Sequence, residues 1–115
     1  ESVFMAALEA WGVEMPGETV KAVAGFGGGM GSGNVCGAVT GGVAALSCAF
    51  VEGVGGHTSP KMMDKVRRYL TEVKETFGSE LCSELKGTYF TQEERCYRTV
   101  CEMAEVLDRV HDSEA

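Results

Sequence analysis

Thirty consecutive residues, 22–51, carry no charged side chain, and this stretch constrains the fold more than any other part of the chain. Nine of the thirty are glycines, and their density over residues 27–33 predicts a loop, because glycine is unfavourable inside a helix. The apolar residues from 35 to 51 then predict a helix. Small side chains recur at every fourth position, which lets a neighbouring helix approach closely: Gly33, Gly37, Gly41, Ala45 and Ala49. We therefore expect a buried central helix.

The same four-residue spacing of small side chains is typical of transmembrane helices that pack closely. A membrane span needs about 20 apolar residues, and the apolar part of this stretch, 35–51, is shorter. It also lacks basic flanks and an aromatic belt. The sequence therefore favours a protein without membrane insertion.

Helical patterns occupy the remainder of the chain. No internal repeat and no strand-like alternation longer than a few residues interrupts them. The predicted fold is therefore all-α, a compact single-domain helical bundle over residues 1–115, in which the glycine-rich loop leads into the buried central helix. The other expected helices cover residues 1–12, a short segment that restarts at 15–17, residues 60–77, residues 79–86 with Ser79 as N-cap, and a last helix behind a Thr91/Glu94 capping box.

Charge and cysteine content narrow the function classes. The net charge of −7 and the sequence pI near 4.8 disfavour nucleic acid as a partner, since the only basic cluster is Lys65, Arg67 and Arg68. The five cysteines are odd in number, and they form neither a CxxC motif nor the spacing of a secreted disulfide scaffold. We expect a cytoplasmic protein whose cysteines are thiols or ligands.

Cys36 is the leading candidate for chemistry, because the glycine loop delivers it to the start of the central helix. Unpaired backbone N–H groups there carry partial positive charge, which favours a thiolate and predicts a reactive redox thiol. Cys82 falls near the start of the expected helix 79–86 and is the second candidate. Cys48, in contrast, lies mid-helix among Ala, Leu and Phe, so we expect it to be buried and inert. His57 and His111 are expected to be solvated.

The segment Cys36–Gly41 reads CGAVTG and resembles the signature of the redox-active protein family named for its C, GCAxxG, C, C cysteine pattern. The similarity covers nearly the whole chain. It extends to the glycine loop at 24–31, to the segment 78–82 that contains Cys82, and to Cys96 with its following apolar residues. The family's first cysteine would fall just upstream of Glu1, so residues before Glu1 are expected to belong to the domain.

The resemblance implies that Cys36, Cys82 and Cys96 converge at one end of the bundle and bind an iron–sulfur cluster or another thiolate-bound metal for electron transfer. The upstream cysteine or Cys101 would complete the ligand set. The glycines expected to shape this site, through the loop and through helix packing, are Gly27, Gly28, Gly29, Gly31, Gly37 and Gly41.

Two other functions stay open at this point. In a thiol/disulfide protein, Cys36 would be the attacking thiol and Cys82 or Cys96 its resolving partner. In a non-catalytic helical module, the glycine loop would bind an anion or a partner at the helix N-terminus, although no basic residue lies near the loop in sequence. A redox partner protein is expected for the first function, and the glycine stripe also allows a homodimer.

Overall fold

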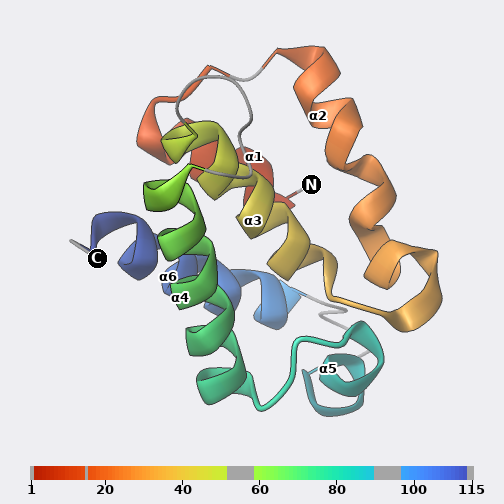
Figure 1. Ribbon diagram of the computed structural model, residues 1–115. Coiled ribbons are helices and arrows are strands. Elements are labelled where there is room, and N and C mark those ends of the chain that lie inside the picture. Colours follow the sequence, from red (N-terminus) through yellow and green to blue (C-terminus); the bar gives the residue numbers. More distant parts are fainter. Residues whose placement is uncertain (1, 15, 52–58, 90–96, 114–115) are drawn as a thin grey trace.

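The uncharged stretch folds as predicted, into a glycine-rich loop followed by helix α3 (Gly37–Phe50), which runs through the middle of the molecule (Figure 1). The computed structural model describes residues 2–14, 16–51, 59–89 and 97–113. Their other elements are α1 (Ser2–Trp11), α2 (Gly17–Val23), the short turns η1 (Ala24–Phe26) and η2 (Gly29–Gly33), α4 (Pro60–Phe77), α5 (Cys82–Tyr89) and α6 (Tyr97–Asp112). The fold is all-α, as predicted.

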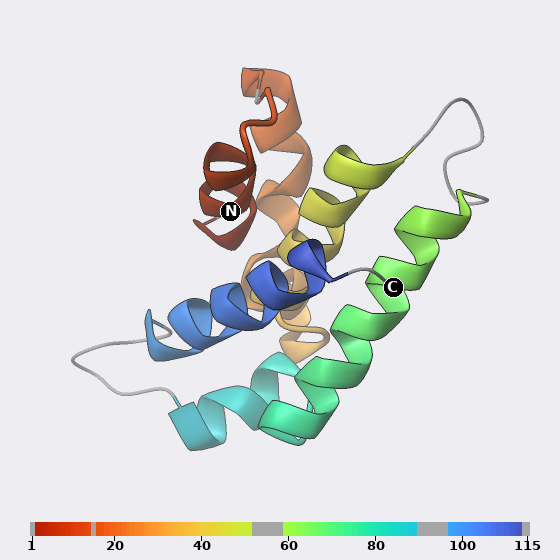
Figure 2. The same cartoon turned by 90° about the vertical axis from the view of Figure 1, so that its left-hand side faces the viewer.

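Helix α3 packs against α1, α4 and α6, and this contact forms the core (Figure 2). Gly41 faces α1, where an added Cβ would lie 3.7 Å from the Phe4 Cβ. Gly42 faces α4, where an added Cβ would lie 2.5 Å from the Tyr69 hydroxyl oxygen. The small-residue pattern therefore does allow close approach, but the tightest contact is at Gly42, one position outside the predicted stripe.

Helix ends follow the sequence signals at several points. Helix α1 ends at Trp11 and is followed by Gly12 in the left-handed region (φ 69°). Helix α4 begins with Pro60 directly after Ser59, and Gly78 ends it with φ 78°. These are the positions where proline and glycine have the backbone geometry that a helix start and a helix end require.

The predicted start of α5 is wrong by three residues. The Ser79 hydroxyl accepts a hydrogen bond from the Leu81 N–H (3.0 Å), but Ser79 is not the N-cap of a helix, because α5 begins only at Cys82. The cause is tertiary: the Cys82 N–H donates to the Asn34 carbonyl, and this bond holds the chain before Cys82 in an extended conformation. The Thr91/Glu94 capping box lies outside the described residues.

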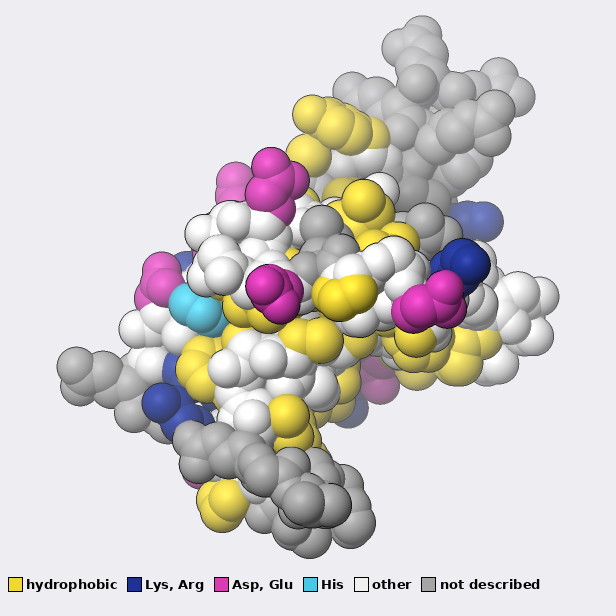
Figure 3. Space-filling model, turned by 90° about the horizontal axis from the view of Figure 1, so that it is seen from above, with side chains coloured by type: hydrophobic (Ala, Val, Ile, Leu, Met, Phe, Trp, Pro, Cys, Tyr) yellow, Lys and Arg dark blue, Asp and Glu magenta, His cyan; other side chains and the backbone are white. Residues whose placement is uncertain are grey.

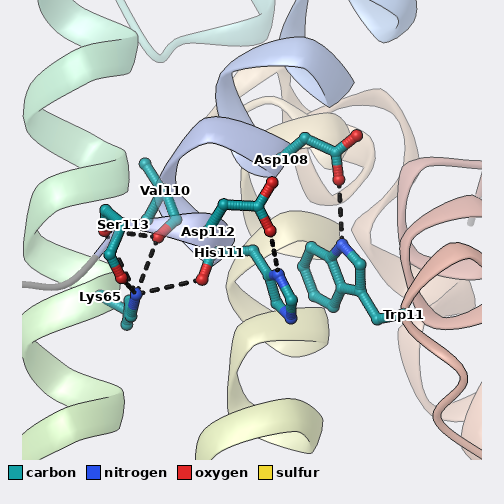
Figure 4. A network of polar contacts seen from close by, with 7 residues as sticks. All are labelled: Trp11, Lys65, Asp108, Val110, His111, Asp112 and Ser113. Carbon is teal, nitrogen blue, oxygen red and sulfur yellow. Dashed lines mark hydrogen bonds and ion pairs between the residues drawn. The ribbon is translucent and has the colours of Figure 1, made fainter.

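Lys65 is buried, with 1% of its surface exposed, so the basic cluster of Lys65, Arg67 and Arg68 contributes only its two arginines to the surface. Its ammonium group donates to the carbonyls of Val110 (3.0 Å) and His111 (3.1 Å) and also to Ser113, so a lysine of α4 caps the C-terminal end of α6 (Figure 4). Burial lowers the pKa of this ammonium. On the face shown in Figure 3, acidic side chains are scattered and Lys and Arg form no continuous patch.

The prediction of a solvated His111 is also wrong. Its ring stacks on the Trp11 ring, with the centroids 4.0 Å apart, and contacts the Phe50 ring at 5.2 Å. The Trp11 indole N–H donates to Asp108 at 2.9 Å (Figure 4). These contacts join the end of α1 to the end of α6. Within the described part of the chain, no helix is long and apolar enough to cross a membrane.

We expect Lys65→Met to lower the free energy of unfolding by about 2–3 kcal/mol, because it keeps the apolar stem but leaves buried carbonyls at the end of α6 without their charged donor. Urea unfolding followed by circular dichroism measures this. Arg67→Met is the control, because it removes only an exposed ion pair with Asp64 and should change stability by no more than about 0.5 kcal/mol. Equal effects of the two substitutions would contradict the capping role.

Candidate thiol site

A single antiparallel β-bridge joins the end of the glycine loop to the segment before α5. Val35 pairs with Leu81, the Cys36 N–H donates to the Glu80 carbonyl (2.7 Å), and the Cys82 N–H donates to the Asn34 carbonyl (2.6 Å). Two short extended segments, 34–36 and 80–82, are thereby held side by side although 43 residues of sequence separate them.

The bridge brings Cys36 and Cys82 to one site. Side chains alternate between the two faces of extended chains, so Cys36 and Cys82 leave the bridge on the same face, opposite to Val35 and Leu81. Both cysteines line one pocket of about 210 Å³. Cys82 is buried, with 6% of its surface exposed, whereas Cys36 is half-buried.

Both cysteines also stand at the start of a helix. Cys36 is the N-cap of α3, and its carbonyl accepts hydrogen bonds from the N–H groups of Val39 (2.9 Å) and Thr40 (3.1 Å). Cys82 is the first residue of α5. The first N–H groups of a helix have no partner within it and carry partial positive charge. The position of Cys36 at a helix start is as predicted, and the thiolate character inferred from it stays a prediction.

The glycine loop fits beneath this bridge in a left-handed conformation. Positive φ angles run from Gly28 through Gly31, including Met30 at 61°. At Gly29 an added Cβ would lie 2.6 Å from backbone atoms of Asn34 and 2.8 Å from the Cys82 Cβ. Only glycine fits there, because the position combines a left-handed backbone with direct contact to both sides of the bridge.

Four separate parts of the chain meet around the two thiols. The beginning of α1, the loop with the first turn of α3, helix α5, and the beginning of α6 all contribute to the pocket. The residues that line it besides the cysteines are Ser2, Val3, Gly27, Gly28, Gly37, Ala38, Lys86, Thr99 and Val100.

The structure separates the six glycines that were expected at the site. Three of them line the pocket, and Gly29 lies directly behind Cys82. Gly31 faces open space, and Gly41 lies in the interface between α1 and α3. The three that line the pocket are Gly27, Gly28 and Gly37.

The remaining cysteines lie apart from the pocket or outside the described residues. Cys96, the third expected ligand, lies outside them. Cys101 is exposed on α6 and is not among the pocket residues. Cys48 is exposed, so the prediction of a buried thiol is wrong. The apolar neighbours of Cys48 suggested burial, but no residue of the last turn of α3, 47–50, is buried.

Two residues at the site carry no motif in the sequence. Tyr69 of α4 is fully buried and donates its hydroxyl to the Ala38 carbonyl (3.1 Å) in the first turn of α3. Burial, and next the charge of Cys36, raise the pKa of Tyr69 far above its ordinary range. Lys86 lines the pocket one helical turn after Cys82. The sequence feature that could have identified Lys86 as a site residue is its spacing of four residues from Cys82 in a predicted helix. This spacing places both side chains on one face of the helix.

Among the residues that the structure describes, no group of three or more His, Cys, Asp and Glu side chains is placed to hold a metal ion. The described part of the pocket therefore provides two thiol ligands, whereas iron–sulfur clusters are mostly held by four cysteine thiolates.

The fold and the pocket define a small all-helical protein with a two-cysteine site built on helix starts. A family model described as "Putative redox-active protein (C_GCAxxG_C_C)" matches residues 1–110, and the chain belongs to this family. No curated protein and no solved structure matches the chain.

We expect Gly29→Ala to destabilise the protein by about 3 kcal/mol or more, because the added Cβ meets rigid backbone in addition to the strain of a left-handed residue. Gly31→Ala separates the two causes. Its φ is 68° with no atom within 4 Å of the added Cβ, so it should lose only about 1–2 kcal/mol. Gly25→Ala, with neither feature, should be nearly neutral. Similar losses at Gly29 and Gly31, measured by urea unfolding, would contradict the contact with the bridge.

We expect alkylation of Cys48 by iodoacetamide to reach its half-maximal rate at a higher pH than a cysteine in an unstructured peptide. Cys48 is exposed as a residue, but its neighbours still remove part of the water around its thiol, and this partial desolvation raises the pKa of Cys48. The thiolate is the reacting form. Labelling between pH 6 and 10, resolved by residue with mass spectrometry, measures the profile. In urea the midpoint should return to that of the peptide; a midpoint in the folded protein at or below the peptide value would refute the shift.

Proposed function

We propose that the pocket is a redox site in which Cys36, Cys82 and Cys96 hold an iron–sulfur cluster or another thiolate-bound metal for electron transfer. The observation that carries the proposal is the convergence of Cys36 and Cys82 on one pocket through the bridge. A cluster or a redox-active metal bound there would supply one-electron chemistry. A protein partner that exchanges electrons and a cytoplasmic location are parts of the same proposal.

The register of the bridge favours shared ligation over a direct disulfide between Cys36 and Cys82. Cys36 lies opposite Glu80 and Cys82 lies opposite Asn34, so the two cysteines are diagonal neighbours. Diagonal residues are typically about 7–8 Å apart, whereas cysteines whose Cα atoms are more than about 7 Å apart form a disulfide only if the backbone moves. Two thiolates at diagonal positions fit a common metal or cluster without that movement.

The size of the pocket supports the same preference. A disulfide needs no free volume beside its sulfur atoms, but about 210 Å³ is open next to these cysteines. A single water molecule needs only about 10–15 Å³ of such volume, so the pocket has room for an ion, a cluster or a small substrate.

Cys96 is the proposed third ligand on sequence grounds. It precedes Thr99 and Val100, which line the pocket, by three and four residues. Cys101 is the weaker candidate, since it is exposed and does not line the pocket. Ser2 at the start of α1 also lines the pocket, so a cysteine just before Glu1, the position that the family resemblance gives, would come from an adjacent part of the site.

Thiol/disulfide exchange is the second candidate, and the difference in exposure between the two cysteines favours it. The half-buried Cys36 thiolate would attack a substrate disulfide and form a mixed disulfide, releasing one substrate thiolate. The buried Cys82 thiolate would then attack the Cys36 sulfur and release the second one. The substrate gains two electrons and the protein is left with a Cys36–Cys82 disulfide, whose formation requires movement of the bridge.

The test is purification without oxygen of the 115-residue chain and of a longer chain that includes its natural upstream residues, followed by visible spectroscopy and assays for iron, zinc and acid-labile sulfide. We expect metal in the wild type, at least in the longer chain, and a reduction to less than a tenth in Cys36→Ser and Cys82→Ser. Cys48→Ser and Cys101→Ser are matched controls that should keep the metal, because both cysteines lie outside the pocket lining.

A colourless protein that holds no redox-active metal in either length, including one that holds only zinc, would refute electron transfer through a bound cluster or metal. Thiol/disulfide exchange would then be tested by counting thiols after oxidation, with a Cys36–Cys82 linkage as its expected product. A protein that holds no metal and forms no reversible disulfide would refute both functions.

A further inference from the structure

Among the described residues that line the thiol pocket, one has a basic side chain, and this residue is Lys86. We propose that Lys86 compensates the negative charge of the pocket thiolates and thereby raises the reduction potential of the site. This inference rests on the redox function proposed above, but it holds for either form of it.

Helix geometry places Lys86 beside Cys82. Both residues belong to α5, Cys82 is its first residue, and four residues separate them, so their side chains lie on the same face about one turn apart. Cys82 is buried at the inner end of this face, and Lys86 is exposed at its outer end. Lys86 therefore lines the pocket while the residue as a whole remains exposed to solvent.

Among the described lining residues, no side chain other than those of Lys86 and the two cysteines is ionisable. The others are glycines, small apolar side chains and the hydroxyls of Ser2 and Thr99.

Reduction adds negative charge to the pocket in both candidate chemistries. Two electrons convert a disulfide into two thiolates, and one electron adds one negative charge to a thiolate-bound metal centre. A nearby positive charge stabilises the reduced state more than the oxidised state, and so favours reduction. Because Lys86 is exposed, solvent screens its charge, and we expect roughly a fivefold effect on the equilibrium constant of reduction.

The experiment compares the midpoint potentials of wild type, Lys86→Gln and Lys86→Arg, by visible spectroscopy if the protein is coloured and by equilibration with glutathione buffers if it is not. We expect Lys86→Gln to favour the oxidised state about fivefold, which corresponds to about 20 mV for a two-electron couple and about 40 mV for one electron. Lys86→Arg should match the wild type, because it keeps the charge. Salt at 1 M should remove most of the difference.

Arg67→Gln is the matched control, since it removes an exposed positive charge of α4 that does not line the pocket. Its midpoint potential should equal that of the wild type. An intact redox couple with an unchanged potential in Lys86→Gln would overturn this inference alone. A wild type without any redox couple would overturn the proposed function and this inference with it.

Discussion

The two backbone hydrogen bonds of the bridge between residues 34–36 and 80–82 are the constraint on which the site depends. They fix the start of α3 and the start of α5 relative to each other, and each start carries a cysteine. The glycine loop exists in a left-handed form because it must pass directly behind this bridge, where Gly29 leaves no room for a side chain. The pocket, its two thiols and the loop are therefore one structural unit.

The surrounding helices hold that unit in place through contacts at both ends of α3. Near the site, the fully buried Tyr69 binds the Ala38 carbonyl and fits against Gly42, so α4 holds the first turn of α3. At the other end, Lys65 of the same helix holds the end of α6, and Trp11 stacks on His111. Helix α4 thus contacts both the first turn of α3, next to the thiol pocket, and the C-terminal end of α6 at the far end of the bundle.

Much of the fold was predictable from local patterns, because glycine, proline and helical periodicity act over a few residues. The loop, the start of α3 at Cys36 and the ends of α4 follow from such signals. The bridge did not follow from local signals, because its hydrogen bonds join residues far apart in sequence. Its two segments are nevertheless alike, since each consists of a polar residue, an apolar residue and a cysteine at a helix start. The burial of Lys65 and the exposure of Cys48 depend on which helices reach them. The apolar neighbours of Cys48 gave the wrong prediction, and nothing local in the sequence indicated the burial of Lys65.

The bridge also makes formation of the pocket a long-range step of folding. Its two segments come from the first and the last third of the chain, and the residues between them, including α4, form the loop that the bridge closes. Closing a loop of this length has an entropic cost that local helix formation does not have. In the unfolded chain the two thiols are therefore distant from each other. Any group bound by both of them would stabilise the native state by mass action, so its binding and the folding of the protein are thermodynamically coupled.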